Sequence, residues 1–477
     1  MPAEEEGPAA QAPMSEVYEP FDASTEAPQQ VPSRPPPRTL EPPRVGVVLA
    51  AGRSERLHKV TGGGSKALVR LGGLTLVERA VRMLLSKGLE KVLVVVGYHA
   101  GPVAAVVGRL APGRVQAIHA EGWEAGNGAS LAAVEQAVKG EDLFVLLTAD
   151  HVFGEVALDS LLRMSRPSVL VDPEPERDIW EEGTRVRIAE GRALEFGKHL
   201  VESTIDCGAF VFPQEVFDAQ RQAADDEDAS LAGAVSLLAA KLPVETVAVP
   251  AGSWWIDVDT PEDLESARRM VRRSLQKEGD GPVSRFLNRP ISSRISMAIA
   301  PLRLPPDLLS LVFLLVGVVA GWLLSVGHGL AGGIATHLAS VLDGVDGETA
   351  RLQLRAGPHG AMLDGVLDRL VDTAILAGMG IWALSTDASP RAVILLTVAA
   401  VAGALLSMAS KDRAASLALP PAPERPIGWT LGGRDGRLLI VTASAIAGVP
   451  LLGLGLVAAT AAVALAIRLM FVLRAGL

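Results

Sequence analysis

The first half of the chain alternates short apolar runs with amphipathic stretches. Runs rich in β-branched residues, "VGVVLA", "KVLVVVG", "DLFVLLTAD" and "GAFVFP", are separated by helical patterns such as "TLVERAVRMLLSKG". This alternation is typical of βα units, in which helices cover both faces of a parallel sheet. We therefore predict an α/β domain with a mostly parallel sheet between residues 45 and 267.

A different pattern begins after Asp307. Residues 308–342 contain no Asp, Glu, Lys or Arg, which is too long for one membrane span and enough for two joined at "SVGHG". Residues 359–386 and 392–410 predict a third and a fourth span, and the uncharged segment 438–467, interrupted at "GVP", predicts two short ones. The second half is therefore expected to be an all-α domain of six transmembrane helices.

The segments that flank these domains have compositions of their own. Residues 1–44 are rich in Pro, Ala and Glu, so we expect a disordered tail, and because it lacks the features of a signal peptide we expect the next domain to be cytosolic. Residues 268–306 form a basic, partly amphipathic connector to the membrane domain, residues 307–477. Lys and Arg gather in the connector, in the 351–355 turn and in the 411–437 loop. The positive-inside rule then predicts a multi-pass protein of the inner (plasma) membrane with both termini in the cytoplasm.

Charge and cysteine content exclude some classes of function. A net charge of −10 without a basic stripe argues against a nucleic-acid partner. The single cysteine, Cys207, excludes an intrachain disulfide and a Cys-rich metal site. It lies in an apolar strand-like run, so we expect it to be an inert core residue.

Four aspartates interrupt the apolar half. Asp343 and Asp346 share a face at the cytoplasmic end of the second predicted span, and Asp364 and Asp368 are one turn apart near the start of the third. The turn "RAGPHG" reverses the chain between them, so the four carboxylates can meet. Like charges gathered at membrane depth are unstable without cations, and oxygen ligands select Mg²⁺, with Mn²⁺ as an alternative. Four carboxylates can hold two such ions about 4 Å apart, as enzymes that act on phosphoryl groups do.

The spacing of this segment, D-x2-D-G-x2-A-R-x8-G-x3-D-x3-D, resembles the signature of the CDP-alcohol phosphotransferase family at every fixed position. The resemblance implies displacement of CMP from a CDP-alcohol by the hydroxyl of a second alcohol, in a six-span fold. It implies a general base, Asp368, that also touches the second ion. The implied metal ligands are Asp343, Asp346 and Asp364. The implied contacts to the cytidine diphosphate are Gly347, Ala350 and Arg351.

Other charged residues near the signature allow more than one interpretation. The carboxylates could merely pair with Arg351, Arg355 and Arg369 at a helix end, but pairing would not require this spacing. Asp372, one turn beyond Asp368, lies outside the signature and is expected on the helix face. Family members also hold a phosphorylated acceptor with basic residues near the fourth and fifth spans. The resemblance assigns this role to Lys411, Arg413, Arg434 and Arg437. Since cytoplasmic flanks are basic anyway, a topology signal alone is the alternative.

The soluble half opens with "VGVVLAAGRSERLHKVTGGGSKALVRLGG", a strand followed by a turn with a single Gly. It is no dinucleotide fingerprint, because the second and third glycines are missing. Backbone amides after a strand can nevertheless cradle phosphates, with Arg56 and Lys66 countering charge as pyrophosphate leaves. The segment resembles the opening of Rossmann-like nucleotidyltransferases that make NDP-sugars and CDP-alcohols, although the proline usual before the lysine is Ser65 here.

Three further segments match these nucleotidyltransferases in order. "LLTAD" ends an apolar strand with Asp150, where open α/β sheets place their ligand chemistry. "WWIDVDTPEDL" supplies Asp257 as the second Mg²⁺ ligand, with Asp259 as a substitute. Lys198 resembles the acceptor-phosphate contact, with a solvated surface lysine as the alternative. The opening turn implies nucleotide contacts from Ala50, Ala51 and Gly52. The segment "GNGASL" implies further nucleotide contacts from Gly126, Asn127 and Ser130.

The fusion itself suggests linked reactions, because one half resembles enzymes that make an NDP-linked alcohol and the other resembles enzymes that consume a CDP-linked one. The architecture resembles the family of bifunctional CTP:inositol-1-phosphate cytidylyltransferase/di-myo-inositol-phosphate-phosphate synthases. That resemblance implies CTP and inositol 1-phosphate as substrates, a CDP-alcohol intermediate, a phosphorylated precursor of a compatible solute as product, and a homodimer through the spans. One alternative is a phospholipid synthase that uses CDP-diacylglycerol, a membrane lipid. Another is a scaffold or transporter that merely binds nucleotide.

Overall fold

The computed structural model of the chain describes residues 40–475 apart from residues 54, 227, 277–278 and 418–423. The expected tail, residues 1–44, therefore lies outside the described residues except for its last positions, 40–44.

The N-terminal domain is built on a nine-stranded sheet. Its strands are β1 (Val45–Ala50), β4 (Lys91–Val96), β5 (Val115–His119), β6 (Leu143–Thr148), β8 (Ser168–Asp172), β9 (Arg185–Ala189), β10 (Arg192–Gly197), β11 (Ile205–Pro213) and β12 (Val244–Ala248). They lie in the order β5-β4-β1-β6-β11-β8-β12-β10-β9. The first four strands in this order are parallel, as predicted, whereas β11 runs antiparallel to both neighbours and makes the second half mixed. An apolar run in the sequence carries no direction, so this reversal was not visible there.

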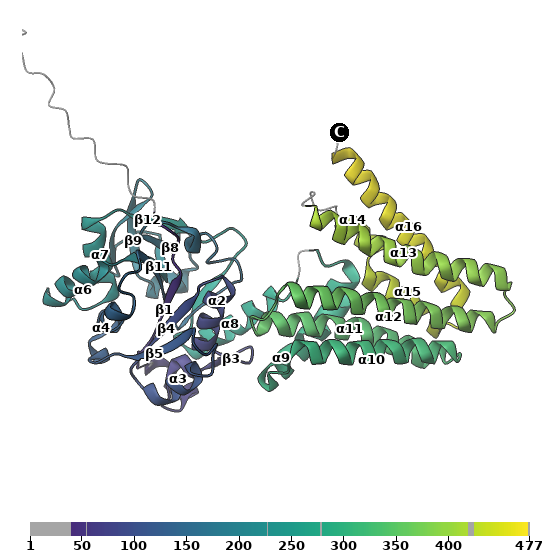
Figure 1. Ribbon diagram of the computed structural model, residues 1–477, viewed down its shortest axis with the longest axis horizontal. Coiled ribbons are helices and arrows are strands. Elements are labelled where there is room, and N and C mark those ends of the chain that lie inside the picture. Colours follow the sequence, from purple (N-terminus) through teal and green to yellow (C-terminus); the bar gives the residue numbers. More distant parts are fainter. Residues whose placement is uncertain (1–39, 54, 227, 277–278, 418–423, 476–477) are drawn as a thin grey trace, which may run out of the picture. The chain divides into compact units, whose positions relative to one another are not determined.

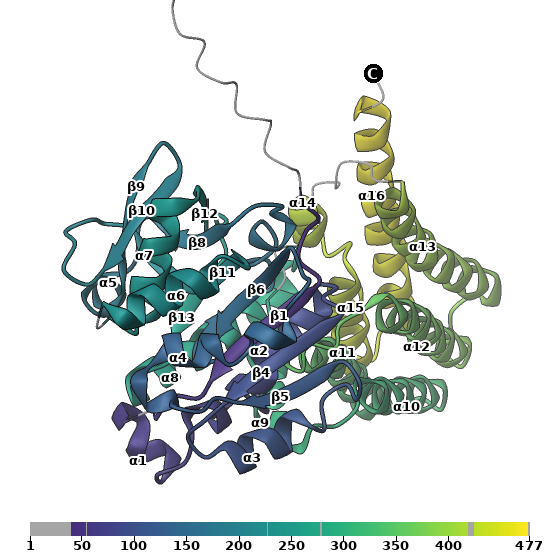
Figure 2. The ribbon, with the colours of Figure 1, turned by 60° about the vertical axis from the view of Figure 1, so that its left-hand side comes forward.

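Helices cover both faces of the sheet, as the alternation predicted (Figure 2). They are α2 (Leu76–Ser86), α3 (Ala100–Val107), α4 (Asn127–Ala132), α6 (Val216–Asp225) and α7 (Leu231–Lys241). The side chains of β1 alternate between the two faces: Val48 belongs to the core with α2 and α3, whereas Val47 and Leu49 belong to the core with α4, α6 and α7. Cys207 is fully buried in this core, where burial raises the pKa of its thiol well above the usual value.

Smaller elements complete this domain. Strands β7 (His151–Phe153) and β13 (Trp255–Asp257) form an antiparallel pair of their own, and so do β2 (Arg70–Leu71) and β3 (Leu74–Thr75). The short helices are α1 (His58–Thr61) and α5 (Arg177–Glu182). Helix α8 (Pro261–Ser274) begins with a capping box between Thr260 and Asp263 and runs through the expected domain boundary at residue 267.

Long helices make up the C-terminal half (Figure 1). They are α10 (Pro306–Ser325), α11 (Gly329–Leu352), α12 (Pro358–Leu384), α13 (Pro390–Ser416), α15 (Arg434–Ile446) and α16 (Pro450–Ala475), preceded by α9 (Arg289–Ile299) and interrupted by the short α14 (Glu424–Trp429). Within the described residues, three helices are long and apolar enough to cross a membrane: Pro306–Ser325, Pro390–Ala414 and Pro450–Arg474. The polar residues of α11 and α12 keep them outside that group, and the count of six spans stays a prediction.

Glycines let two of these helices approach closely. Gly321 of α10 lies against the Ala374 carbonyl group of α12, and a Cβ on Gly378 would overlap the Gly321 carbonyl group. Helices that share a lipid solvent gain little from hydrophobic burial against each other, so such backbone contact is a main source of packing energy. Close packing of the two backbones at these glycines therefore stabilises the contact between α10 and α12.

The end of α11 is hydrogen-bonded by the N-terminal domain. Arg79 and Arg82 of α2 donate to the carbonyl oxygens of Leu352 at 3.2 Å and Gln353 at 3.0 Å. Arg303, just before α10, makes a bidentate ion pair with the buried Glu78 of α2, at 2.9 and 2.6 Å. The last carbonyl groups of a helix have no partner within it, so α2 serves as a cap for α11.

Replacing Gly378 tests this packing. The substitution Gly378→Val should destabilise the α10–α12 contact by about 1–3 kcal/mol through overpacking, seen as a lower midpoint of thermal unfolding in detergent. The control is Gly455→Val in α16, where an added Cβ would meet nothing within 4 Å. Equal losses in both variants would show that helix propensity, not close contact, is responsible.

Candidate active sites

The first site lies where β6 ends. Asp150 follows this fully buried strand, and His151 opens β7. Asp257 is placed opposite His151 by the antiparallel β7–β13 register, and the backbone N–H of Val258 donates to the Asp150 carbonyl oxygen at 3.1 Å. Two aspartates more than a hundred residues apart are thus brought together by one short ladder.

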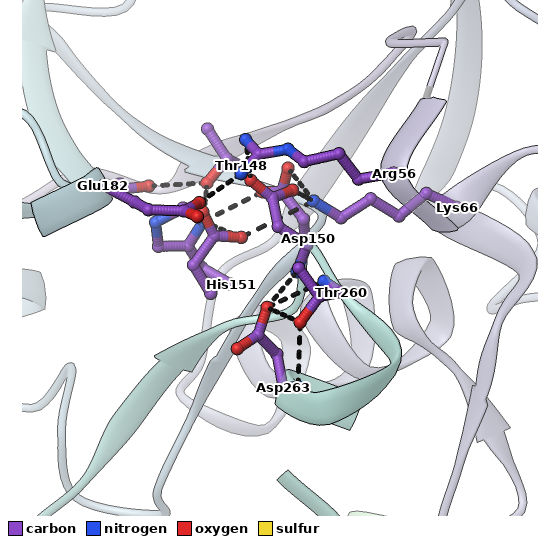
Figure 3. A network of polar contacts seen from close by, with 11 residues as sticks. Arg56, Lys66, Thr148, Asp150, His151, Glu182, Thr260 and Asp263 are labelled. Carbon is purple, nitrogen blue, oxygen red and sulfur yellow. Dashed lines mark hydrogen bonds and ion pairs between the residues drawn. The ribbon is translucent and has the colours of Figure 1, made fainter. Parts of the chain in front are cut away.

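Lys66 joins these aspartates from the segment that follows the three glycines at positions 62–64 (Figure 3). It begins the 3₁₀ turn η2 (Lys66–Leu68), and the Ser65 hydroxyl accepts from the Ala67 N–H at 3.3 Å as the N-cap. The Lys66 ammonium is buried, 2.9 Å from Asp150 Oδ2 and 3.5 Å from Asp257 Oδ1, and it also contacts Asp259. Ser65 stands where similar nucleotidyltransferases usually have a proline. Here it caps the turn that carries Lys66.

His151 is a site residue that sequence reasoning missed. Its Nδ1 lies 2.9 Å from Asp150 Oδ1 and 3.8 Å from Asp257 Oδ1, and 2.7 Å from the Thr148 hydroxyl. One oxygen or nitrogen from each of Asp150, His151 and Asp257 lies within 4.8 Å of the others, a spacing that suits a metal ion. The position of His151 directly after Asp150 was its only signal in the sequence.

Burial and charge shift the pKa values in this cluster. Burial lowers the pKa of Lys66, but the carboxylates of Asp150 and Asp257 outweigh it, so the pKa is raised. Burial also lowers the pKa of His151, but the carboxylates of Asp257 and Asp150 outweigh it and raise the pKa to about 9. For Asp150, burial is outweighed by Lys66 and His151, and its pKa falls well below the usual value. The pKa of Asp257 is raised, chiefly by burial, which marks it as the carboxylate least compensated by neighbouring cations.

The donor set fits a divalent cation. Oδ1 of Asp257 is buried and makes no hydrogen bond among the described residues, although the Lys66 ammonium is nearby. Buried carboxylate oxygens of this kind are stabilised by a hard cation such as Mg²⁺. Asp150 and Asp257 would hold it. Asp259 instead contacts two cationic side chains, Lys66 and Arg56, the latter at 2.6 Å.

A cavity of about 580 Å³ opens beside this cluster. Gly126, Asn127 and Lys198 line it together with Asp257, so these predicted residues share one space. Gly126 has a φ of 115°, which favours glycine. Other predicted nucleotide contacts lie differently: Ala50, Ala51 and Ser130 are buried, and Gly52 is exposed. Arg56, predicted to counter charge as pyrophosphate leaves, has a half-exposed side chain that pairs with Glu182.

The second site lies between α11 and α12. Carboxylate oxygens of Asp343, Asp364 and Asp368 lie within 4.8 Å of one another, which suits a metal ion. Asp346, the fourth predicted ligand, accepts from the Ser310 hydroxyl of α10 at 2.7 Å and from the Gly347 N–H. Three acidic oxygens so close together need positive charge, so this donor set also fits a hard divalent cation.

Arg434 supplies positive charge to the same carboxylates. Its Nη1 lies 2.9 Å from Asp343 Oδ2 and 3.1 Å from Asp368 Oδ1, and its Nε donates to Asp372 Oδ1 at 3.0 Å. Asp372 is thus a buried partner of Arg434, not the simple helix-face residue expected. Its spacing of i+4 from Asp368 was the signal that could have revealed it.

A cavity of about 360 Å³ adjoins this second site. Among the predicted acceptor contacts, Lys411, Arg434 and Arg437 line it, and Arg413 does not. Arg468, which ends the last uncharged run, also lines it and was missed. The predicted cytidine-diphosphate contacts Gly347, Ala350 and Arg351 follow Asp346 on α11, and the Arg351 guanidinium donates to the Leu275 carbonyl oxygen at 3.1 Å.

Comparison with protein families gives two matches that agree with the two sites. Residues 46–244 match the MobA-like NTP transferase domain, and residues 303–472 match the CDP-alcohol phosphatidyltransferase family. The chain is therefore an enzyme with a nucleotidyltransferase domain joined to a CDP-alcohol phosphotransferase domain.

Curated relatives share the whole architecture. The chain is 35% identical over 414 residues to a bifunctional IPC transferase and DIPP synthase of Rubrobacter xylanophilus, covering 84% of this chain and 90% of the relative. It is 34% identical over 347 residues to one of Thermococcus kodakarensis, covering 70% of this chain and 75% of the relative. It is also 30% identical over 167 residues to a phosphatidylinositol phosphate synthase of Mycobacteroides abscessus, covering 35% and 73%. The chain belongs to the family of bifunctional IPC transferases and DIPP synthases.

Metal binding should separate Asp257 from Asp259. In a full-length background carrying Asp343→Asn and Asp368→Asn, which disables the second site, Asp257→Asn should weaken Mn²⁺ binding by more than about tenfold, since even indirect supports of metal ligands contribute that much. Asp259→Asn should have a smaller effect because Asp259 contacts cationic side chains. Electron paramagnetic resonance of free Mn²⁺ measures both; a larger effect of Asp259→Asn would reverse the assignment.

Proposed function

We propose that the two domains catalyse consecutive reactions on inositol 1-phosphate. In the first, its phosphate attacks the α-phosphorus of CTP and pyrophosphate leaves, which gives a CDP-linked inositol. In the second, the hydroxyl of another inositol 1-phosphate attacks the phosphorus bound to inositol, and CMP leaves. The product is di-myo-inositol phosphate phosphate. The observation that carries this proposal is the presence of two separate acidic clusters. Asp150 of the first lies within residues 46–244, with Asp257 shortly after that match, and the second lies wholly within residues 303–472.

The first reaction would use the cluster around Asp150 and Asp257. A Mg²⁺ ion held by these residues would neutralise charge on the α-phosphate and on the departing pyrophosphate. Lys66 keeps its proton because three carboxylates surround it, so it can offset phosphate charge. Lys198 lines the same cavity and would bind the phosphate of the acceptor. We expect Arg56 to support pyrophosphate release from its half-exposed position.

The second reaction would use the cluster between α11 and α12. Asp343, Asp346 and Asp364 would hold Mg²⁺, which stabilises the charge on the diphosphate. Asp368 would accept the proton of the attacking hydroxyl, as the general base. Arg434, Arg437 and Lys411 line the adjoining cavity and would bind the acceptor phosphate by charge-assisted hydrogen bonds. Arg434 would then exchange part of its contact with Asp343 and Asp368 for the acceptor.

A lipid product is the second candidate. The chain is similar over 167 residues to a phosphatidylinositol phosphate synthase, and the motif for CDP-alcohol transfer does not define the alcohol. In this alternative the membrane domain would transfer a lipid-linked phosphate from CDP-diacylglycerol to inositol phosphate. The N-terminal domain would then serve a separate substrate.

The surroundings of the second domain are part of the proposal. We propose a multi-pass protein of the inner (plasma) membrane with both termini in the cytoplasm. Many large apolar side chains of its helices are exposed, including Leu311, Leu315 and Trp322 of α10, and lipid would cover them. Part of this surface would also join two copies of the chain in a homodimer.

Phosphorus NMR of the purified protein with CTP, Mg²⁺ and inositol 1-phosphate tests the reaction. We expect CTP to yield pyrophosphate first, and CMP with a new phosphodiester afterwards. Release of CMP from CDP-diacylglycerol with inositol 1-phosphate as the acceptor, and no release of CMP without that lipid, would favour the lipid alternative. No loss of CTP would contradict inositol 1-phosphate as the first acceptor.

Single substitutions should separate the two reactions. Asp150→Asn should slow pyrophosphate release by about 100-fold or more, through lost stabilisation of developing charge, while added CDP-alcohol should still yield CMP. Asp368→Asn should lower CMP release by about 100-fold, as expected for a general base, and leave pyrophosphate release unchanged. Loss of both activities in either variant would contradict two independent sites.

A further inference from the structure

The juxtamembrane helix α9 packs on the signature helix α11 through a buried polar seam. On one side lie Asn288 and two serines of α9; on the other lie three residues of α11. The seam consists of Asn288, Ser292 and Ser296 facing Ser340, Gly344 and Glu348. Each set recurs at i, i+4 and i+8, which keeps its members along one face of a helical segment. Sequence reasoning noted α9 only as part of a basic connector.

Glu348 is the centre of this seam. Its carboxylate is fully buried and accepts from the Ser292 and Ser296 hydroxyls, each at 2.7 Å, and from Arg289 Nη1 at 2.9 Å. Arg289 in turn donates to Asp280 at 2.8 and 3.1 Å. Gly344 allows this approach, because a Cβ there would lie 3.1 Å from both Arg289 Nη1 and Ser292 Oγ. A buried carboxylate with three donors holds one geometry, since any rotation would leave it unpaired.

The seam also reaches the acceptor side of the site. The Asn288 amide donates to Ser340 Oγ at 2.9 Å and to Asp435 Oδ1 at 3.0 Å, and the Ser340 hydroxyl donates to the same oxygen at 3.0 Å. Asp435 is the neighbour of Arg434 in the first turn of α15. The segment before α10 is therefore bonded to the helix that carries Asp343 and to the helix that carries Arg434.

Helix geometry links the seam to the metal ligands. Glu348 and Asp343 are five residues apart, which places their side chains about 140° apart around the axis of α11. A rotation of α11 that broke the seam would therefore turn Asp343 and Asp346 away from Asp364 and Asp368. Asp343 and Asp346 make their contacts with Arg434 and Ser310 on the face turned away from Glu348, so the seam restrains α11 from the other side.

We propose that Glu348 is a positioning residue, held by Ser292, Ser296 and Arg289, that sets the rotation of α11 and thereby the affinity of the second site for divalent cations. The inference rests on the proposed CMP-releasing reaction for its kinetic test only. Residues that orient metal ligands without touching the metal commonly contribute in this way.

Two variants of the full-length protein test the seam: Glu348→Gln, and the double variant Ser292→Ala with Ser296→Ala. Each should raise the Mg²⁺ concentration for half-maximal CMP release by about tenfold, and pyrophosphate release should not change. Mn²⁺ binding, measured by electron paramagnetic resonance in the Asp150→Asn, Asp257→Asn background, should weaken by a similar factor. The matched control is Ser293→Ala. Ser293 is a buried serine on the same helix that makes no hydrogen bond with Glu348 among the described residues, so this variant should bind Mn²⁺ normally.

Two results would overturn the proposal. The first is wild-type Mn²⁺ affinity in both seam variants. The second is a lower maximal rate and lower thermal stability with an unchanged Mg²⁺ dependence, because the seam would then only stabilise the fold. Absence of CMP release from the wild-type protein would contradict the proposed function instead, and the Mn²⁺ measurement would still decide the role of Glu348.

Discussion

Compensation of buried carboxylates is the constraint on which both halves of this enzyme depend. Moving a carboxylate out of water is costly unless cations or several hydrogen-bond donors surround it. In the N-terminal domain, Lys66 and His151 compensate the charge of Asp150, whereas Asp257 has less positive charge around it. Between α11 and α12, Arg434 forms ion pairs with Asp343, Asp368 and Asp372. A divalent cation would complete each cluster, which would account for the number of acidic side chains gathered there.

The two sites solve the same electrostatic problem on different scaffolds. The first uses the carboxyl end of a sheet, where the short β7–β13 ladder places His151 opposite Asp257. The second uses two helices whose aspartates recur every three or four residues and face each other across a turn. A ladder fixes side chains through the backbone, but a helix can rotate about its axis. The helical site therefore needs outside support, and Ser310 and the seam around Glu348 provide it.

Much of this could be predicted from the sequence, and the failures have physical reasons. Hydrophobic periodicity located β1, β4, β6 and β11 because buried strands are continuous apolar runs. Motif spacing located the acidic cluster between α11 and α12 because it fixes which residues share a helix face, and the position of Asp150 after an apolar strand located the first cluster. His151, Asp372 and Arg468 were missed because their roles come from partners distant in the sequence. The direction of β11 and the polar seam were missed for the same reason: a serine stripe reads as an ordinary polar face until its partner is known.

The contact between α2 and the end of α11 gives the fusion a mechanical meaning. Arg79 and Arg82 complete the hydrogen-bond ladder of the helix that carries Asp343 and Asp346. A membrane half cut away from the N-terminal domain would therefore expose the last carbonyl groups of α11, the helix that carries its own aspartates. An exchange of halves with a relative would have to keep α2 and the last turn of α11 from the same chain, because these two elements are hydrogen-bonded to each other.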